Sequence, residues 1–272
     1  MRQRSPASAG VVYVAFGAAY RELAVLSILW LRRFGYSGPV RVVTGEEYWP
    51  ADFLGCEIVR VPHVGDGFTT RYYKTQINNY AYDTTLFLDA DTLPVASVGK
   101  IWGELRFSEM CVSVDYHPSV QDLMTKSTIG RERREREFRY MSDLGLMHHP
   151  FYSSGVMLFR RSAATDQLFT IWHEEWNRFR HEDQLALVRA IARTGVKVRT
   201  LAPRWNARLK GFRTIENAQL RGVRILHFRP GNARLVRALL QQPALVDAGP
   251  KRTLRQRLWF WIRRLKMVIG AG

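Results

Sequence analysis

Short apolar runs that alternate with an amphipathic helical segment constrain the fold of this chain more than any other feature. Apolar stretches at residues 10–16, 40–45 and 56–61 have the length and β-branched content of buried strands. Leucines and a tryptophan at helical spacing predict a helix over residues 20–33, between the first two of these strands. Strands that alternate with helices indicate a doubly wound α/β domain with a mostly parallel, Rossmann-like central sheet flanked by helices.

The same alternation continues along most of the chain. Further strands are predicted at residues 85–88, 110–114, 151–159, 196–201 and 224–228. Further helices are predicted at residues 71–82, 98–105, 163–178 and 182–193. Between residues 115 and 150 the periodicity is too weak to assign elements. The sequence therefore predicts a disordered leader at 1–9, a single domain at 10–249 and a tail at 250–272.

Composition limits the cellular setting. The only two cysteines, Cys56 and Cys111, lie in apolar runs and are expected to be buried, which excludes a disulfide framework and suits a reducing compartment. The apolar run 11–15 is short and a charged helix follows it, so we interpret it as the first strand and not as a signal peptide. No stretch reaches the roughly 18–20 apolar residues of a membrane-spanning helix. We expect a cytoplasmic protein.

The chain is strongly basic, with a formal net charge of +17, which implies an anionic partner: nucleic acid, a membrane surface or a phosphorylated substrate. Residues 251–266 contain seven Lys or Arg and no carboxylate. On a helical wheel, residues 251–269 form a basic amphipathic helix suited to the interface of an anionic membrane, or alternatively to docking on the domain itself. The run Arg131–Glu137 alternates in sign and predicts a solvated helical face.

Two carboxylates, Asp89 and Asp91, follow the predicted strand 85–88 directly. In a parallel sheet, residues that follow a strand lie at the edge where ligands bind. Like charges in a partly desolvated site repel each other, and a divalent cation relieves the repulsion. Mg²⁺ or Mn²⁺ commonly bridges such carboxylates to substrate phosphates. An Asp-x-Asp triplet can also be a turn that uses Asp for backbone hydrogen bonds.

Six motifs in a fixed order make the chain resemble nucleotide-diphospho-sugar glycosyltransferases with the GT-A fold, most closely glycosyltransferase family 8. The motifs are Val12–Gly17 with Tyr20, Arg71–Lys74, Leu86–Thr92, Tyr152–Phe159, Glu182–Gln184 and Leu226–Phe228. The resemblance implies a GT-A fold with a nucleotide-binding half at 10–95 and a donor-sugar and acceptor half at 96–249. It also implies a retaining transfer of a hexose from a nucleotide diphosphate sugar, expected to be a UDP-sugar, to a glycan or lipid-linked acceptor.

The resemblance also implies roles for individual residues. Asp89, Asp91 and His227 would hold Mn²⁺ or Mg²⁺, while Lys74 and Arg71 would neutralise the leaving diphosphate. The other donor contacts would come from the nucleobase loop, the Asp-x-Asp turn and the strand at 151–159: Tyr20, Ala90, Ser153, Ser154 and Gly155. Two catalytic residues begin the helix at 182–193: Asp183 would bind sugar hydroxyls, and the side-chain oxygen of Gln184 would lie near the anomeric carbon. Helix capping is the structural alternative for Asp183, and a core hydrogen bond is the alternative for His227.

The sequence departs from the family pattern at two places. Ser153 stands where the family has Asn, and residues 229–234 replace its Lys-Pro-Trp element. The phosphate contact of that lysine is therefore either replaced, with Arg234 as the candidate, or absent. These departures leave the nucleobase and the donor sugar undefined. Trp205, in the segment Trp205–Arg208, is interpreted as structural, although this segment often contacts donor or acceptor in the family.

Three other functions compete with the transferase. A haloacid dehalogenase-type phosphatase has Asp-x-Asp-x-Thr, whereas Thr92 follows Asp91 directly here. A basic nucleic-acid-binding protein would explain the net charge but not the ordered motifs. A degenerate transferase that binds nucleotide without turnover remains open. The setting we predict is a cytoplasmic enzyme bound peripherally to the inner face of a membrane.

Overall fold

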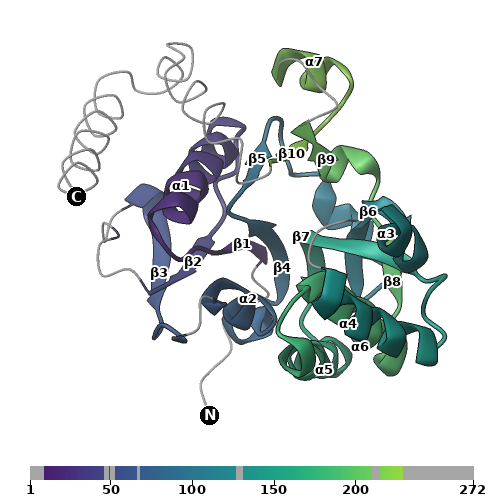
Figure 1. Ribbon diagram of the computed structural model, residues 1–272. Helices are drawn as coiled ribbons and strands as arrows, with labels where there is room; N and C mark the ends of the chain where they lie inside the picture. The colour runs from purple at the N-terminus through teal and green to yellow at the C-terminus, as the bar shows by residue number, and fades with distance from the viewer. Residues whose placement is uncertain are drawn as a thin grey trace, which may run out of the picture. The chain divides into compact units, whose positions relative to one another are not determined.

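The predicted alternation of strands and helices forms a seven-stranded sheet in the computed structural model of the chain (Figure 1). The strand order is β3-β2-β1-β4-β7-β6-β8. The strand bounds are β1 Ala9–Val14, β2 Val40–Thr44, β3 Cys56–Arg60, β4 Thr84–Asp89, β6 Met110–Ser119, β7 Pro150–Arg160 and β8 Val198–Thr200. All neighbouring pairs are parallel except the two that β7 makes with β4 and β6. The predicted mostly parallel sheet is therefore confirmed, with one reversed strand.

The structure describes residues 9–45, 49, 53–65, 68–126, 131–209 and 215–228. All of them belong to one compact unit, Met1–Phe228. The second unit, Arg229–Gly272, lies outside the described residues, and with it the predicted tail, the domain end at 249 and Arg234. Of the predicted leader, only Ala9 is described, and it is the first residue of β1.

A second, three-stranded sheet has the order β5-β10-β9. It consists of β5 (Thr92–Pro94), β9 (Ala207–Arg208) and β10 (Ile225–His227). β5 follows the Asp-Ala-Asp turn at the end of β4, and it pairs antiparallel with β10 so that His227 lies opposite Thr92. Because β9 also pairs with β10, three distant parts of the sequence meet beside the end of β4.

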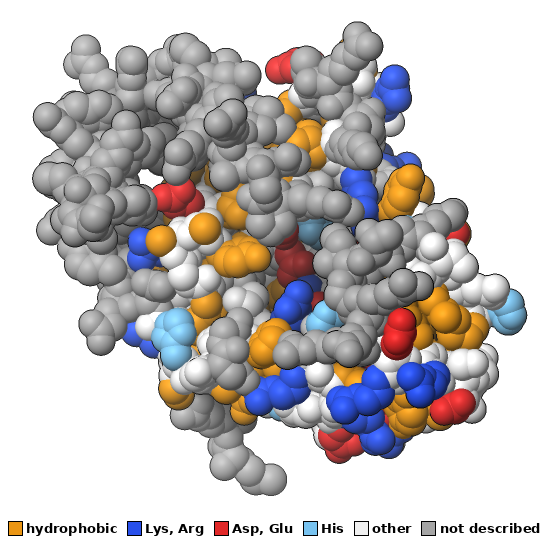
Figure 2. All heavy atoms as spheres, in the orientation of Figure 1, with side chains coloured by type: hydrophobic (Ala, Val, Ile, Leu, Met, Phe, Trp, Pro, Cys, Tyr) orange, Lys and Arg blue, Asp and Glu red, His pale blue; other side chains and the backbone are white. Residues whose placement is uncertain are grey.

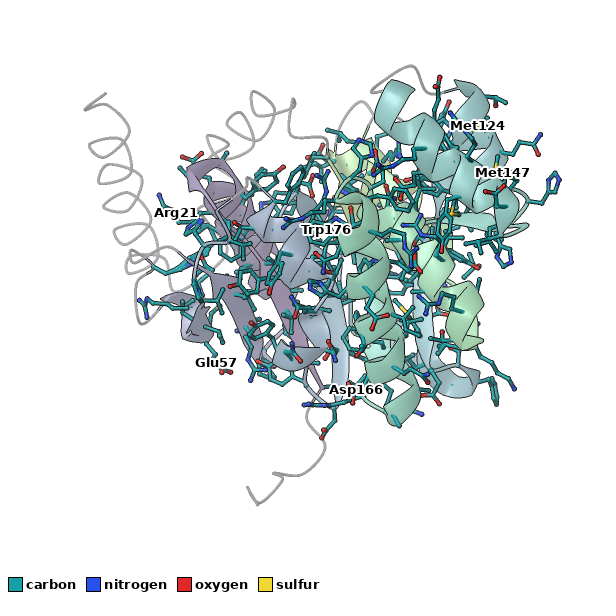
Figure 3. All side chains as sticks on the ribbon, turned by 60° about the horizontal axis from the view of Figure 1, so that its bottom comes forward. Arg21, Glu57, Met124, Met147, Asp166 and Trp176 are labelled. Carbon is teal, nitrogen blue, oxygen red and sulfur yellow. The ribbon has the colours of Figure 1, made fainter. Side chains whose placement is uncertain are left out.

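Helices cover both faces of the large sheet. The α-helices are α1 Ala18–Arg33, α2 Thr69–Lys74, α3 Val120–Lys126, α4 Arg131–Asp143, α5 Ala163–Phe179, α6 Asp183–Thr194 and α7 Ile215–Leu220. Side chains of β1 alternate between two cores: Val12 and Val14 pack in the cluster that includes α5 and α6, whereas Val11 and Tyr13 pack with α1. Figure 3 labels Asp166 near the beginning of α5 and Trp176 near its end. Both faces of the sheet are thus buried, as its apolar strands require.

The prediction of one continuous helix over residues 71–82 is wrong. The chain forms α2, a break at Thr75 and Gln76, and then the 3₁₀ helix η2 (Ile77–Tyr80). The Thr75 hydroxyl donates to the backbone carbonyls of Arg71 and Tyr72 and also contacts Nδ1 of His173, at 2.8 Å. Such local hydrogen bonds compete with helix propagation. The helix predicted at 98–105 is likewise a 3₁₀ helix, η3 (Ile101–Phe107).

The other differences concern residues 115–150 and the charged run at 131–137. β6 extends five residues beyond the predicted end at 114, and the helices α3 and α4 follow it. Glu135 and Arg136 are exposed, as predicted for a solvated helical face. Glu137 is fully buried, so the prediction is wrong at that position. Its carboxylate accepts a 2.8 Å hydrogen bond from the buried guanidinium of Arg189 on α6, which compensates its charge.

Two predictions from composition are also tested by the structure. Cys56 and Cys111 are free, buried thiols, as expected for strand residues. Within the described ranges, no helix combines the length and the apolar composition needed to cross a membrane.

Candidate functional site

Three potential metal ligands meet where β4 and β10 end. Asp89 is the last residue of β4, Asp91 follows two residues later, and His227 is the last residue of β10. One ligand atom from each of the three residues lies within 4.8 Å of the others. Four buried residues precede Asp89 on β4. The Thr92 hydroxyl donates to the backbone carbonyl of Asp89 at 2.7 Å, which fixes the turn. The sequence prediction that these three side chains converge is thus matched by their placement.

Gly155, on β7, leaves room for the side chains of this cluster. A Cβ atom at residue 155 would overlap the imidazole of His227 and lie 3.1 Å from Oδ2 of Asp89. A glycine at this point of a buried strand therefore has a specific cause, the close approach of two ligand side chains.

Asn206 orients the imidazole of His227. The Nδ2 group of Asn206 donates to Oγ of Ser153 at 3.0 Å, and its Oδ1 lies 3.0 Å from Nδ1 of His227. Because Oδ1 can only accept, Nδ1 of the imidazole carries the proton of this hydrogen bond. Nε2 then faces Asp91, whose Oδ1 is 3.4 Å away. Histidine ligands in metal sites are commonly held by such a second hydrogen bond.

The electrostatics of the cluster favour a cation. Burial raises the pKa of Asp89, and the neighbouring Asp91 raises it further, although Lys74 opposes both effects. Burial works against the charged form of His227, but the hydrogen bond and charge of Asp91 outweigh it and raise the pKa of the imidazole. Two carboxylates and one imidazole, with space between them, are a donor set that fits Mn²⁺ or Mg²⁺.

Lys74 connects the metal cluster to Asp183. Its ammonium group lies 2.8 Å from Oδ2 of Asp89 and 3.1 Å from Oδ2 of Asp183. Burial disfavours the charged form of Lys74, but the two carboxylates outweigh burial and raise its pKa. Arg71, one turn earlier on α2, has its Nε 3.5 Å from the other oxygen of Asp183. The two basic residues predicted on this helix are therefore both directed at the site.

Asp183 does not cap its helix. It is the first residue of α6, where Glu182 is the N-cap and makes no side-chain capping hydrogen bond. The Asp183 carboxylate instead accepts a 2.6 Å hydrogen bond from the hydroxyl of Ser154 on β7. Burial opposes its ionised form, but Lys74, Arg71 and Ser154 together lower the pKa of Asp183 to about 2. The capping alternative is thereby replaced by an ionised carboxylate within the site.

Gln184 is the next residue on α6. Its side-chain nitrogen donates to the backbone carbonyl of Tyr152, at 3.1 Å, and to Oδ2 of Asp115, at 3.4 Å. Both oxygens of Asp115 are in turn 2.7 and 2.8 Å from Nη2 of Arg208. Asp115 was not among the predicted site residues. The sequence does contain a pattern that could have identified it: Asp115 directly follows the apolar run 110–114, as Asp89 follows the apolar run 85–88.

The remaining predicted residues are placed as follows. Tyr20 lies in the first turn of α1 and is half-buried. Burial and then the charges of Asp91 and Asp89 raise its pKa, so it is within electrostatic reach of both carboxylates. Ala90 is buried in the turn. Trp205 is buried and donates to a side-chain oxygen of Glu104 at 3.3 Å, which agrees with the structural interpretation. In Figure 2, acidic side chains are recessed among basic and hydrophobic ones near the centre of the face shown.

Comparison with known proteins identifies the fold. No protein-family model and no curated protein sequence matches the chain. Among solved structures, galactosyltransferase LgtC in complex with donor and acceptor sugar analogues is similar, with a TM-score of 0.54 and 13% identity over 86% of this chain and 96% of that one. An active-site mutant of LgtC gives a TM-score of 0.52 and 14% identity, over 80% and 86% of the respective chains.

A second similar enzyme is the bifunctional glycosyltransferase WbbM, with a TM-score of 0.55 and 14% identity. The match covers 84% of this chain and 46% of WbbM. The chain therefore has the GT-A fold of these glycosyltransferases, as predicted from its sequence.

Proposed function

We propose that the chain is a metal-dependent glycosyltransferase that moves a hexose from a nucleotide diphosphate sugar, expected to be a UDP-sugar, to a glycan or lipid-linked acceptor with retention. The observation that carries this proposal is the single cluster formed by Asp89, Asp91 and His227 with Lys74, in a GT-A fold. The fold alone would not define the chemistry, because function resides in the site.

Asp89, Asp91 and His227 would hold Mn²⁺ or Mg²⁺. When bound, such an ion binds phosphate oxygens and stabilises the negative charge of a leaving diphosphate. The fit rests on three features already described: the spacing of the ligand atoms, the space left by Gly155 and the imidazole held through its Nδ1 by Asn206.

Lys74 and Arg71 would neutralise the leaving diphosphate from the protein side. Lys74 is positioned between two carboxylates and stays protonated, so that its charge is available at neutral pH. Arg71 is half-exposed, with 44% of its side-chain surface accessible, and can reach a phosphate that enters from solvent. Tyr20 would contact the nucleobase end of the same ligand. Groups preorganised around a developing charge are the largest common source of rate enhancement.

Asp183 and Gln184 would act on the donor sugar. The ionised Asp183 can accept hydrogen bonds from sugar hydroxyls, and Ser153, Ser154 and Gly155 would line the same pocket. The side-chain oxygen of Gln184 would stabilise positive charge at the anomeric carbon. One of the similar LgtC structures is of an active-site variant in which a glutamine is replaced by glutamate, which supports a role for a glutamine in this fold.

The charge of the chain supports the proposed membrane location. A net charge of +17 suits association with an anionic membrane surface, and the basic segment 251–269 would provide the contact. We therefore propose a cytoplasmic enzyme that works at the inner face of a membrane on a glycan or lipid-linked acceptor.

Thermal unfolding tests the metal–nucleotide site. The protein is heated with UDP in Mn²⁺, with UDP in EDTA, and with GDP in Mn²⁺ as the nucleobase control. UDP at about 100 times its dissociation constant adds about 2.7 kcal/mol, or roughly 5–10 °C in the melting temperature. A rise that disappears in EDTA supports the proposal, and release of UDP from UDP-glucose or UDP-galactose then measures turnover. A melting temperature unaffected by both nucleotides in Mn²⁺ would refute donor binding.

A further inference from the structure

The amide of Gln184 is held in one of its two possible orientations. Its Nε2 group donates to Oδ2 of Asp115 and to the carbonyl of Tyr152, and both of these partners are acceptors. A rotation of the amide by 180° would point its oxygen at two other oxygens and lose both hydrogen bonds. Oδ2 of Asp115 and the Tyr152 carbonyl therefore force the side-chain oxygen of Gln184 to the opposite side. Within the described part of the chain, no residue donates a hydrogen bond to that oxygen.

Arg208 fixes Asp115 in turn. The same nitrogen, Nη2, lies 2.7 Å from one carboxylate oxygen and 2.8 Å from the other. The Asp115 side chain is only 8% exposed, whereas that of Arg208 is 38% exposed. A carboxylate with so little access to water depends on this cation, because an unpaired buried charge is costly. The Arg208 guanidinium also lies over the ring of Tyr116, 5.3 Å from its centroid, which limits its own motion.

The position of Arg208 in the fold relates this pair to the metal cluster. Arg208 is the residue of β9 that lies opposite His227 of β10. Two residues earlier on the same segment, Asn206 contacts the imidazole of His227. Asn206, which precedes β9, and Arg208, in β9, thus contact a metal ligand and the acceptor of the Gln184 amide, respectively.

We propose that Arg208 is a positioning residue that acts through Asp115 to direct the side-chain oxygen of Gln184 toward the reacting sugar. The inference rests on the proposed function, because it needs a reaction in which that oxygen takes part. Arg208 is not among the three potential metal ligands, and the proposed donor contacts do not include it. Its removal leaves Asp115 without the cation that fixes it, so the Gln184 amide keeps the Tyr152 carbonyl but loses its fixed second acceptor, while the metal cluster and the Lys74 contacts remain.

The experiment compares four full-length variants with the wild type: Arg208→Met, Arg208→Lys, Asp115→Asn and the control Arg199→Met. Arg199 also pairs with a carboxylate, Glu104 at 3.3 Å, and has a similar side-chain exposure of 47%, but it lies on β8. The measurements are kcat and KM for UDP release from UDP-glucose and UDP-galactose, UDP affinity in Mn²⁺, and the melting temperature.

Arg208→Met and Asp115→Asn are expected to lower kcat by about 10- to 100-fold, with KM and UDP affinity within about twofold of wild type. Arg208→Lys should recover most of kcat, because a single nitrogen makes both contacts with Asp115. Arg199→Met should match the wild type.

Two results would overturn the inference while the proposed function stands. Unchanged kcat in Arg208→Met would show that the pair does not position Gln184. Parallel losses of kcat, UDP affinity and melting temperature in both Arg208→Met and Asp115→Asn would show a purely structural role. If the wild type itself neither binds UDP nor releases it from either donor, the proposed function fails, and the inference fails with it.

Discussion

Asp89 and Asp183 share the ammonium group of Lys74, at 2.8 and 3.1 Å, yet their pKa values are shifted in opposite directions. The pKa of Asp89 is raised and that of Asp183 is lowered to about 2. Burial disfavours the ionised form of both carboxylates, so the difference comes from their other neighbours. Asp89 has the like charge of Asp91 beside it, whereas Asp183 has Arg71 and the hydroxyl of Ser154.

The comparison separates two parts of one site. The negative charge of Asp183 is balanced by Lys74 and Arg71 and by the hydrogen bond from Ser154, so this carboxylate needs no cation from a ligand. The cluster of Asp89, Asp91 and His227 keeps an excess of negative charge, which a divalent cation can relieve. We therefore expect substitutions at the metal cluster to cost function and little stability, and substitutions at Asp183 to cost both.

Asp91→Asn should have the largest effect on function. It removes one of two carboxylate ligands, so turnover of UDP-sugars should fall by about 10²- to 10³-fold and the Mn²⁺-dependent stabilisation by UDP should disappear. In EDTA its free energy of unfolding should stay within about 1 kcal/mol of wild type, because lost pairing with His227 is offset by relieved repulsion of Asp89. Full activity would refute the metal cluster, and a large loss of stability in EDTA would refute the comparison.

Gly155→Ala should have the next largest effect. The added Cβ would overlap the imidazole of His227, so the cluster must open; overpacking of this kind costs about 1–3 kcal/mol. UDP-dependent stabilisation in Mn²⁺ should be lost, although no ligand atom has been removed. Gly103→Ala is the matched control, because nothing lies within 4 Å of a Cβ built at residue 103. Normal Mn²⁺-dependent UDP binding by Gly155→Ala would contradict the close approach of β7 to His227.

Features that depend on local sequence could be predicted. The apolar strands, and the carboxylates that follow one of them, are visible in short windows, and parallel topology places such residues at the ligand-binding edge. Asp89 and Asp91 could therefore be predicted from the sequence together with the fold, whereas Lys74 was expected only from the resemblance to GT-A glycosyltransferases.

Features that depend on pairs distant in sequence could not be predicted in the same way. Glu137 appears in an alternating charged run, and only its contact with Arg189, 52 residues later, accounts for its burial. Asn206 directly precedes β9 and Arg208 ends it, and this two-residue strand is too short to give a periodic pattern. The Thr75 hydroxyl, where α2 ends, contacts His173, which is 98 residues away.

Asp183→Asn tests the other half of the comparison through the pH dependence of stability. The pKa of Asp183 is about 2 in the folded protein, against about 3.9 for an unperturbed Asp, so its ionised form stabilises the fold at pH values above 3.9. At pH 7, Asp183→Asn should lower the free energy of unfolding by about 2 kcal/mol. The stabilising contribution is lost as the pH falls through 3.9 toward 2, so the difference between the two proteins should shrink by about half between pH 5 and pH 3. Urea unfolding in EDTA at several pH values measures this difference, and Asp166→Asn on α5 serves as a control carboxylate outside the site. A difference that is independent of pH would mean that Lys74, Arg71 and Ser154 do not hold Asp183 ionised, and the contrast with Asp89 would then fail.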